Sequence, residues 1–163
     1  MNAPHTTTGP RLDYMQLSAD LFKKYLAFSM TNTMDESLAL LVDIRASQLN
    51  GCAFCLDMHI KQAKLHGERE LRLHHVAIWR ESNLFTPKER AAFAWTEALT
   101  KIEGEGVADD LYEATRAHFT EQELSDLTFR IVAINGWNRL NVAFRNPPGS
   151  KDKMFGLDKA GLV

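Results

Sequence analysis

Apolar residues recur at spacings of three and four along most of this 163-residue chain, which is the period of an amphipathic α-helix. No stretch shows the alternation of apolar and polar residues that is typical of a β-strand. The apolar stripes predict about seven helices, at roughly 17–28, 35–50, 52–66, 68–80, 86–102, 108–119 and 120–144. Helices joined by short connections indicate an all-α fold, a single-domain helical bundle.

Capping and turn residues mark the ends of these segments. The runs 86–89 (TPKE) and 120–123 (TEQE) each place threonine at a helix start and glutamate three residues later, which is the capping-box pattern. The run 146–149 (NPPG) ends the last helix. We therefore expect residues 1–12 to form a flexible lead-in, residues 13–146 the helical domain, and residues 147–163 a tail.

Composition narrows the possible partners and location. The formal net charge of −2 gives no basic surplus, so nucleic acid and anionic membranes are not expected partners. No apolar run approaches the roughly 20 residues that span a bilayer. The first residues lack a charged segment followed by an apolar one, so no secretory signal is expected and the predicted location is cytoplasmic. In that reducing compartment an isolated cysteine pair is typical of catalysis or metal binding.

The chain has two cysteines, Cys52 and Cys55, and both lie where one predicted helix ends and the next begins. Gly51 provides the turn, because glycine adopts the left-handed backbone that ends helices. His59 follows Cys55 by four residues, so the two side chains share one helix face. The free amides of a first helical turn favour an anion and thereby lower a thiol pKa. This pattern predicts a redox-active dithiol with a base within reach.

Three other interpretations of the motif remain open. Both cysteines could be buried and inert, with His59 on the helix surface. A zinc ion could bind Cys52, Cys55, His59 and one further histidine, although structural zinc sites usually gather four close ligands. The dithiol could also be a redox sensor that forms a disulfide without turnover.

Three segments of the sequence resemble the AhpD-like alkylhydroperoxidase group of the carboxymuconolactone decarboxylase superfamily. They are residues 47–59 (SQLNGCAFCLDMH) with the Gly67 break, residues 91–99 (AAFAWTEAL) and residues 133–140 (AINGWNRL). The resemblance implies an all-helical homo-oligomer, commonly a trimer or hexamer. It also implies reduction of hydroperoxides with electrons from an external thiol reductant, without a bound cofactor or metal. The decarboxylase branch, which the resemblance implies lacks the cysteine pair, is the alternative enzyme class.

By motif match, Cys55 is the expected peroxidatic cysteine, Cys52 the resolving cysteine and His59 the proton-relay histidine. The sequence departs from the best-known pattern at Phe54, where that pattern has histidine, and at Leu40, where it has a relay glutamate. Glu36 lies one helical turn before Leu40, so we expect its side chain to replace the missing glutamate.

Two further charged residues, Asp43 and Arg45, fall within the apolar second helix. They are expected to form ion pairs inside an oligomer, without a catalytic role.

Overall fold

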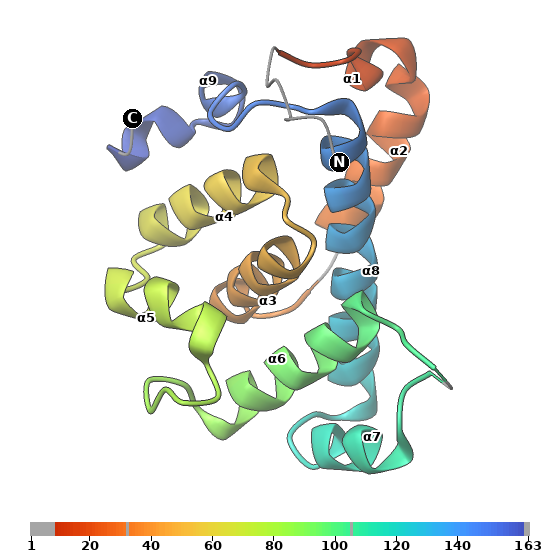
Figure 1. The fold of residues 1–163 in the computed structure, drawn as a ribbon, viewed down its shortest axis with the longest axis vertical. Helices are drawn as coiled ribbons and strands as arrows, with labels where there is room; N and C mark the ends of the chain where they lie inside the picture. Colours follow the sequence, from red (N-terminus) through yellow and green to blue (C-terminus); the bar gives the residue numbers. More distant parts are fainter. Residues whose placement is uncertain (1–8, 32, 105, 162–163) are drawn as a thin grey trace, which may run out of the picture.

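The computed structural model describes residues 9–31, 33–104 and 106–161, so residues 1–8 of the predicted lead-in lie outside the described residues. Within the described part the chain forms helices and no strand (Figure 1), which confirms the all-α fold. In chain order the helices are α1 Tyr14–Leu17, α2 Ala19–Met30, α3 Glu36–Leu49, α4 Ala53–Leu65, α5 Glu70–His75, the 3₁₀ turn η1 Val76–Ile78, α6 Pro87–Thr100, α7 Asp109–Arg116, α8 Glu121–Phe144, α9 Asp152–Phe155 and the 3₁₀ turn η2 Leu157–Ala160.

Local capping chemistry sets the main helix boundaries, and both predicted capping boxes are confirmed. Thr86 accepts a hydrogen bond from the Glu89 amide at the start of α6, and the Glu89 carboxylate accepts one from the Thr86 amide. Thr120 and Glu123 make the same exchange at the start of α8. These reciprocal bonds satisfy amides that have no partner within the helix.

Two segments differ from the sequence-based expectation. The first predicted helix is divided at Ser18, whose backbone φ of −120° is not helical, so that α1 and α2 form separate elements. The region expected to be a tail contains α9 and η2, and Leu157 and Ala160 of η2 are buried. The elements that the period of the apolar residues did not reveal are α1, α9 and η2, each of which has four residues.

Helix α3 forms the centre of the bundle and contacts α4, α6 and α8 (Figure 1). Its apolar side chains are buried on every side, as the all-round apolar pattern predicts. The charged residues Asp43 and Arg45 pair within the same chain, with Arg130 and Glu97 respectively. This corrects the expectation that they pair inside an oligomer, and the cause is that α6 and α8 bring opposite charges against α3.

Helix α8 is the long helix along one edge of the molecule in Figure 1, and α2 lies against it. The contact depends on Gly136, because a Cβ atom there would lie 1.9 Å from the hydroxyl oxygen of Tyr25. That hydroxyl donates a hydrogen bond to the Ala133 carbonyl at 2.9 Å. A residue with a side chain at position 136 would therefore force α2 away from α8.

The C-terminal segment is held against α4 by a buried lysine. The Nζ atom of Lys61 lies 2.8 Å from Asp57 of its own helix and 2.7 Å from Asp152 of α9. Asp57 also accepts a hydrogen bond from the Gly149 amide at 3.0 Å. These contacts anchor residues that lie far from α4 in the sequence, and they place α9 and η2 beside α4.

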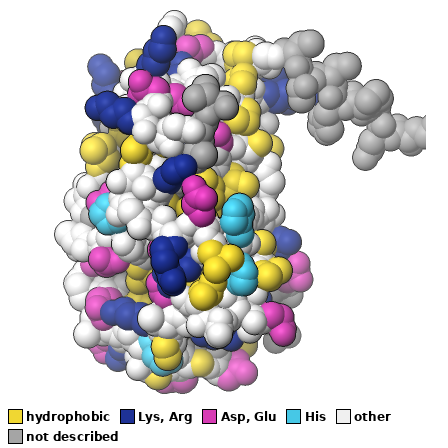
Figure 2. Space-filling view, turned by 90° about the vertical axis from the view of Figure 1, so that its left-hand side faces the viewer, with side chains coloured by type: hydrophobic (Ala, Val, Ile, Leu, Met, Phe, Trp, Pro, Cys, Tyr) yellow, Lys and Arg dark blue, Asp and Glu magenta, His cyan; other side chains and the backbone are white. Residues whose placement is uncertain are grey.

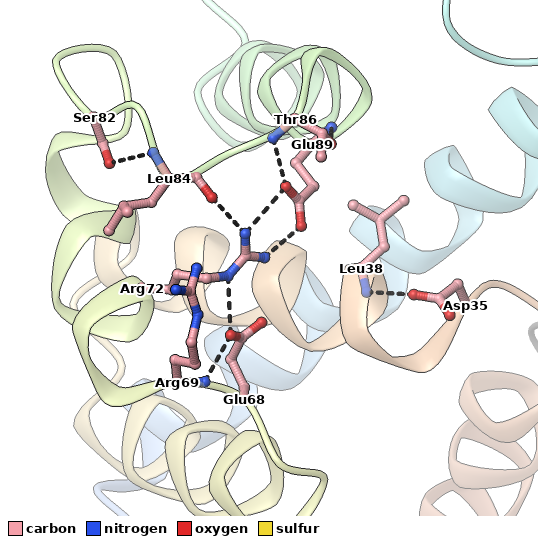
Figure 3. A network of polar contacts seen from close by, with 9 residues as sticks. All are labelled: Asp35, Leu38, Glu68, Arg69, Arg72, Ser82, Leu84, Thr86 and Glu89. Atoms are coloured by element: carbon pink, nitrogen blue, oxygen red, sulfur yellow. Dashed lines mark hydrogen bonds and ion pairs between the residues drawn. The ribbon is translucent and has the colours of Figure 1, made fainter.

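A second ionic network joins α5 to α6 (Figure 3). The guanidinium of Arg72 donates to Glu68, to Glu89 and to the Leu84 carbonyl. Glu89 also belongs to the capping box of α6, so the network links a helix start to its neighbour. The Arg72 guanidinium and both glutamates of this network therefore have partners of opposite charge.

The described surface shows no sign of a membrane segment or a single-sign charge patch on the face in view. No helix among the described residues is both long and apolar enough to cross a bilayer. On the face shown in Figure 2, acidic and basic side chains are interspersed, with histidines and apolar side chains between them.

Candidate dithiol active site

The turn between α3 and α4 brings the two cysteines to the start of α4. Gly51 has a φ of +63°, the left-handed conformation expected there. The side chain of Asn50 donates to Asn135 at 2.9 Å and to Asn138 at 2.8 Å, which fixes the turn against α8. The cysteine motif is therefore held between two helices of the core.

Cys52 is the N-cap residue of α4, and Cys55 occupies the third position of the helix. The Cys52 sulfur accepts a hydrogen bond from the Cys55 amide at 3.3 Å. The two residues are joined by a disulfide, with 5.4 Å between their Cα atoms. Both are buried. The spacing that predicts a redox pair thus corresponds to two sulfurs within bonding reach.

His59 lies one turn after Cys55 and is buried, and oxygen acceptors surround one of its ring nitrogens. Its Nδ1 atom is 2.7 Å from Gln62 Oε1 and 3.4 Å from an Asp43 carboxylate oxygen. Two acceptors at Nδ1 favour the tautomer that carries its proton there. The Nε2 atom is buried and has no hydrogen-bond partner among the described residues, so it is an available base.

The carboxylate beside His59 is held by Arg130 of α8. The Nε atom of Arg130 is 3.0 Å from Asp43 Oδ1, and its Nη2 atom contacts Oδ2. This two-point contact fixes the plane of the carboxylate and compensates its burial. The result is a line of groups, from Arg130 through Asp43 to His59, that ends at an unpartnered nitrogen.

Burial keeps His59 neutral. Removal from water lowers the pKa of the imidazole below 6.5, the Asp43 carboxylate acts in the opposite direction, and Arg130 lowers the pKa further. The ring is therefore unprotonated near neutral pH. A neutral imidazole with a free Nε2 atom can accept a proton.

A cavity of about 470 Å³ lies beside this line of groups. Its walls come from α1, α2, α3, α4, α8 and α9, and most of them are apolar. The polar residues that it reaches include His59, Asp43, Arg130, Tyr14 and Asn141. An apolar chamber with a few convergent polar groups is the usual form of a small-molecule site.

The four sequence-predicted site residues do not all meet. Cys52, Cys55 and His59 share the start of α4, whereas Glu36 is exposed at the start of α3. The Glu36 carboxylate lies 3.6 Å from His66 Nδ1, at the far end of α4. The structure therefore places Asp43, two helical turns further along α3, beside His59 in place of Glu36. The antiparallel course of α3 and α4 is the reason.

Sequence reasoning missed the functional candidates Asp43, Arg130 and Asn141. Asp43 left one signal, because an acid in a helix that is apolar all round requires a buried partner. Arg130 and Asn141 left none, since their importance depends on α8 packing against α3 and α4.

A zinc site, the alternative interpretation of the cysteine motif, would need several metal-binding side chains close together. In the described parts of the chain, no group of three or more histidine, cysteine or acidic side chains is arranged to hold a metal ion.

Comparison with known sequences places this site in a family. The sequence model of the carboxymuconolactone decarboxylase family matches residues 16–98, about half of the chain, which includes the cysteine motif. The chain belongs to the carboxymuconolactone decarboxylase family. The uncharacterized protein YdfG of Bacillus subtilis is 39% identical to this family member over 137 residues, which cover 84% of the chain and 90% of YdfG.

Two further comparisons agree. The uncharacterized protein YnjA of Escherichia coli is 36% identical over 115 residues, 70% of the chain and 62% of YnjA. A solved structure from Agrobacterium tumefaciens, named a protein of unknown function and putative antioxidant defence protein AhpD, has a TM-score of 0.82 and 39% identity. It covers 85% of this chain and 97% of its own. The protein is an AhpD-like member of the carboxymuconolactone decarboxylase family.

Proposed function

We propose that this protein is a thiol-dependent peroxidase that reduces organic hydroperoxides through a Cys52–Cys55 dithiol cycle. The observation that carries the proposal is the disulfide-forming pair at the start of α4, one turn from a neutral buried histidine that lines an apolar cavity. Thiolate nucleophile, base and chamber are the parts that such a reaction needs.

The cycle begins with reduced cysteines. His59 Nε2 accepts the Cys55 proton, and the thiolate attacks the outer oxygen of the hydroperoxide. The O–O bond breaks, the alcohol leaves with the proton from His59, and Cys55 becomes a sulfenic acid. The Cys52 thiol displaces water from that sulfenic acid to form the disulfide, and two external thiols return the pair to the dithiol.

Asp43 and Arg130 serve this cycle by orienting the base. Gln62 accepts from His59 Nδ1–H, and the Asp43 carboxylate, 3.4 Å from the same nitrogen, stabilises the imidazolium that forms when Nε2 is protonated. Arg130 holds the carboxylate in position. We assign to Asp43 the role that the sequence suggested for Glu36.

The cavity supports an organic peroxide as the substrate. Phe22, Phe54, Trp137 and Phe155 are among its walls, and apolar walls gain free energy from an alkyl or aryl group. Hydrogen peroxide lacks such a group and would obtain nothing from these walls. We therefore expect a compact alkyl or aryl hydroperoxide to react faster than hydrogen peroxide.

Thiol loss on addition of substoichiometric cumene hydroperoxide tests the proposal. The reduced wild type is expected to lose both thiols, because the sulfenic acid closes to a disulfide. Cys52→Ser should stop at a sulfenic acid that dimedone traps, and Cys55→Ser should not react. If neither thiol of the wild type reacts faster than free cysteine, the peroxidase assignment is wrong.

We also propose that the protein is a homo-oligomer, a trimer or a hexamer, that associates through α2 and α8. Leu21 of α2 and the α8 residues Phe129 and Val132 are more than half exposed, and the two helices lie side by side (Figure 1). Exposed apolar faces of this kind are typical of subunit interfaces.

Sedimentation at micromolar concentration tests the oligomer. Val132→Glu should dissociate it, whereas Ile102→Glu, which adds the same charge at another exposed apolar position, should not. A monomeric wild type would contradict the proposal.

A further inference from the structure

Asn141 of α8 is the polar side chain that touches the sulfur of Cys55. Its Nδ2 atom lies 3.5 Å from Cys55 Sγ, and the side chain is buried. The proposed cycle requires a thiolate at this sulfur, in a region from which water is excluded. A thiolate there needs a donor, because an uncompensated buried charge is costly.

The orientation of the Asn141 amide is fixed by its other contacts. The Nδ2 atom also donates to the Trp137 carbonyl at 2.9 Å, and Oδ1 accepts from Tyr14 at 3.3 Å and from Asn146 at 2.7 Å. A reversed amide would place its oxygen against the Trp137 carbonyl. Its NH₂ group therefore faces the sulfur of Cys55.

The two residues that hold the Asn141 oxygen come from opposite ends of the chain. Burial raises the pKa of Tyr14 to about 12, with the Asn141 contact acting in the opposite direction, so the hydroxyl remains a neutral donor throughout the physiological range. Arg145 ends α8 in the left-handed conformation, which turns Asn146 back toward the helix. The backbone N–H of Asn146 then donates to the backbone carbonyl of Asn141 at 3.2 Å. One contact thus depends on α1 and the other on the end of α8.

We propose that Asn141 donates the hydrogen bond that stabilises the Cys55 thiolate, and that Tyr14 and Asn146 are positioning residues that aim its amide at the sulfur. This inference rests on the proposed function, which makes Cys55 the attacking thiol. A hydrogen bond to a thiolate is charge-assisted, so it is stronger in the reduced enzyme than in the disulfide form. Asn141 therefore favours the nucleophilic state of Cys55.

The test is an ultraviolet titration of the Cys55 thiolate in the reduced Cys52→Ser protein, which contains a single thiol. Serine keeps the N-cap oxygen acceptor at position 52, so α4 remains capped. The measurement needs no peroxide and no turnover. The other titratable groups that line the cavity, Tyr14, Asp43, His59 and Arg130, are unchanged when Asn141 is replaced.

In this background Asn141→Leu, which is similar in size and carries no ionisable group, and Asn141→Ser are expected to move the midpoint of the thiolate titration upward by about one pH unit or more, because the charge-assisted bond is lost. Tyr14→Phe should move it in the same direction by a smaller amount, since the amide keeps its Asn146 contact. Thr128→Ala is the matched control, because it removes a half-buried α8 hydroxyl that accepts from Trp95 and lies outside the lining of the cavity. It should leave the midpoint in place.

Circular dichroism identifies variants that have not folded, and two replacements at position 141 provide independent chances of a folded protein. An unchanged midpoint in a folded Asn141 variant would overturn the inference, as would an equal shift in Thr128→Ala. If the midpoint shifts as expected while Cys55 shows no fast reaction with peroxide, Asn141 keeps its role and the peroxidase assignment fails. The two outcomes are therefore distinguishable.

Discussion

Arg72 and Arg130 both bind carboxylates, but the two ionic networks that they form differ in one respect. Arg72 contacts two glutamates and a carbonyl, and this network closes on itself between α5 and α6 (Figure 3). Arg130 binds Asp43, which leads to His59 and ends at a buried nitrogen with no partner among the described residues. The first arrangement completes the fold. The second leaves one bond unmade beside a cavity, which is what a reacting molecule can use.

The largest expected effect comes from replacing Asp43 in the network of Arg130, Asp43 and His59, which we call the open network because it ends at a nitrogen that is unpartnered in the described part of the chain. Asp43→Asn leaves Arg130 without its compensating charge and should lower the free energy of unfolding by about 3–5 kcal/mol. It should also slow peroxide reduction by about 10²-fold or more, because His59 loses the group that stabilises its protonated form. Urea unfolding and single-turnover thiol oxidation measure the two effects.

A double replacement tests whether the Asp43–Arg130 pair affects the rate independently of stability. Asp43→Leu with Arg130→Met exchanges the buried ion pair for apolar side chains, which is often neutral for stability. We expect stability to recover relative to Asp43→Asn while peroxide reduction stays slow. Recovery of the rate together with stability would show that the pair is structural only.

Breaking the Arg72 network should lower stability and leave activity unchanged. Arg72→Met removes the donor to Glu68, Glu89 and Leu84, and should cost about 2–3 kcal/mol of unfolding free energy. The rate per folded molecule should remain that of the wild type, because this network does not reach the cavity. A slowed reaction in fully folded Arg72→Met would contradict the distinction between the two networks.

The pH dependence reports on the open network directly. Because the pKa of His59 is lowered below 6.5 in the folded protein, the unfolded chain binds a proton more readily there. Stability contributed by this group is therefore fully present above about pH 6.5 and is lost as the pH falls toward the folded pKa. The acidic limb of the peroxide reaction should likewise lie below pH 6.5. An acidic limb above pH 6.5 would argue against His59 as the base.

The smallest effect is expected at Glu36. Its carboxylate is exposed and lies beside His66, so Glu36→Gln should leave the rate of thiol oxidation within about twofold of the wild type. A large loss would restore the role that the sequence alone suggested for this residue.

The parts of the molecule that local sequence determines were predictable. Helix starts follow from capping residues such as Thr86 and Thr120, and the common face of Cys55 and His59 follows from their spacing on one helix. The carboxylate partner of His59 was not predictable in this way. Asp43 and Arg130 are 87 positions apart, and only the packing of α8 on α3 brings them together. The exchange of Glu36 for Asp43 depends on packing in the same way, because the antiparallel course of α3 and α4 places His59 beside Asp43.

The buried Lys61 anchor has a consequence for how this protein can diversify. It secures a short C-terminal segment that contributes Phe155 to the wall of the cavity, yet that segment supplies neither cysteine nor His59. Residues 147–161 therefore shape one wall of the cavity without contributing to the cysteine motif. Grafting this segment from a relative that keeps the lysine and its two aspartates would reshape the chamber and leave the dithiol chemistry in place, and a bulky fusion attached there would disturb substrate choice before it disturbed folding.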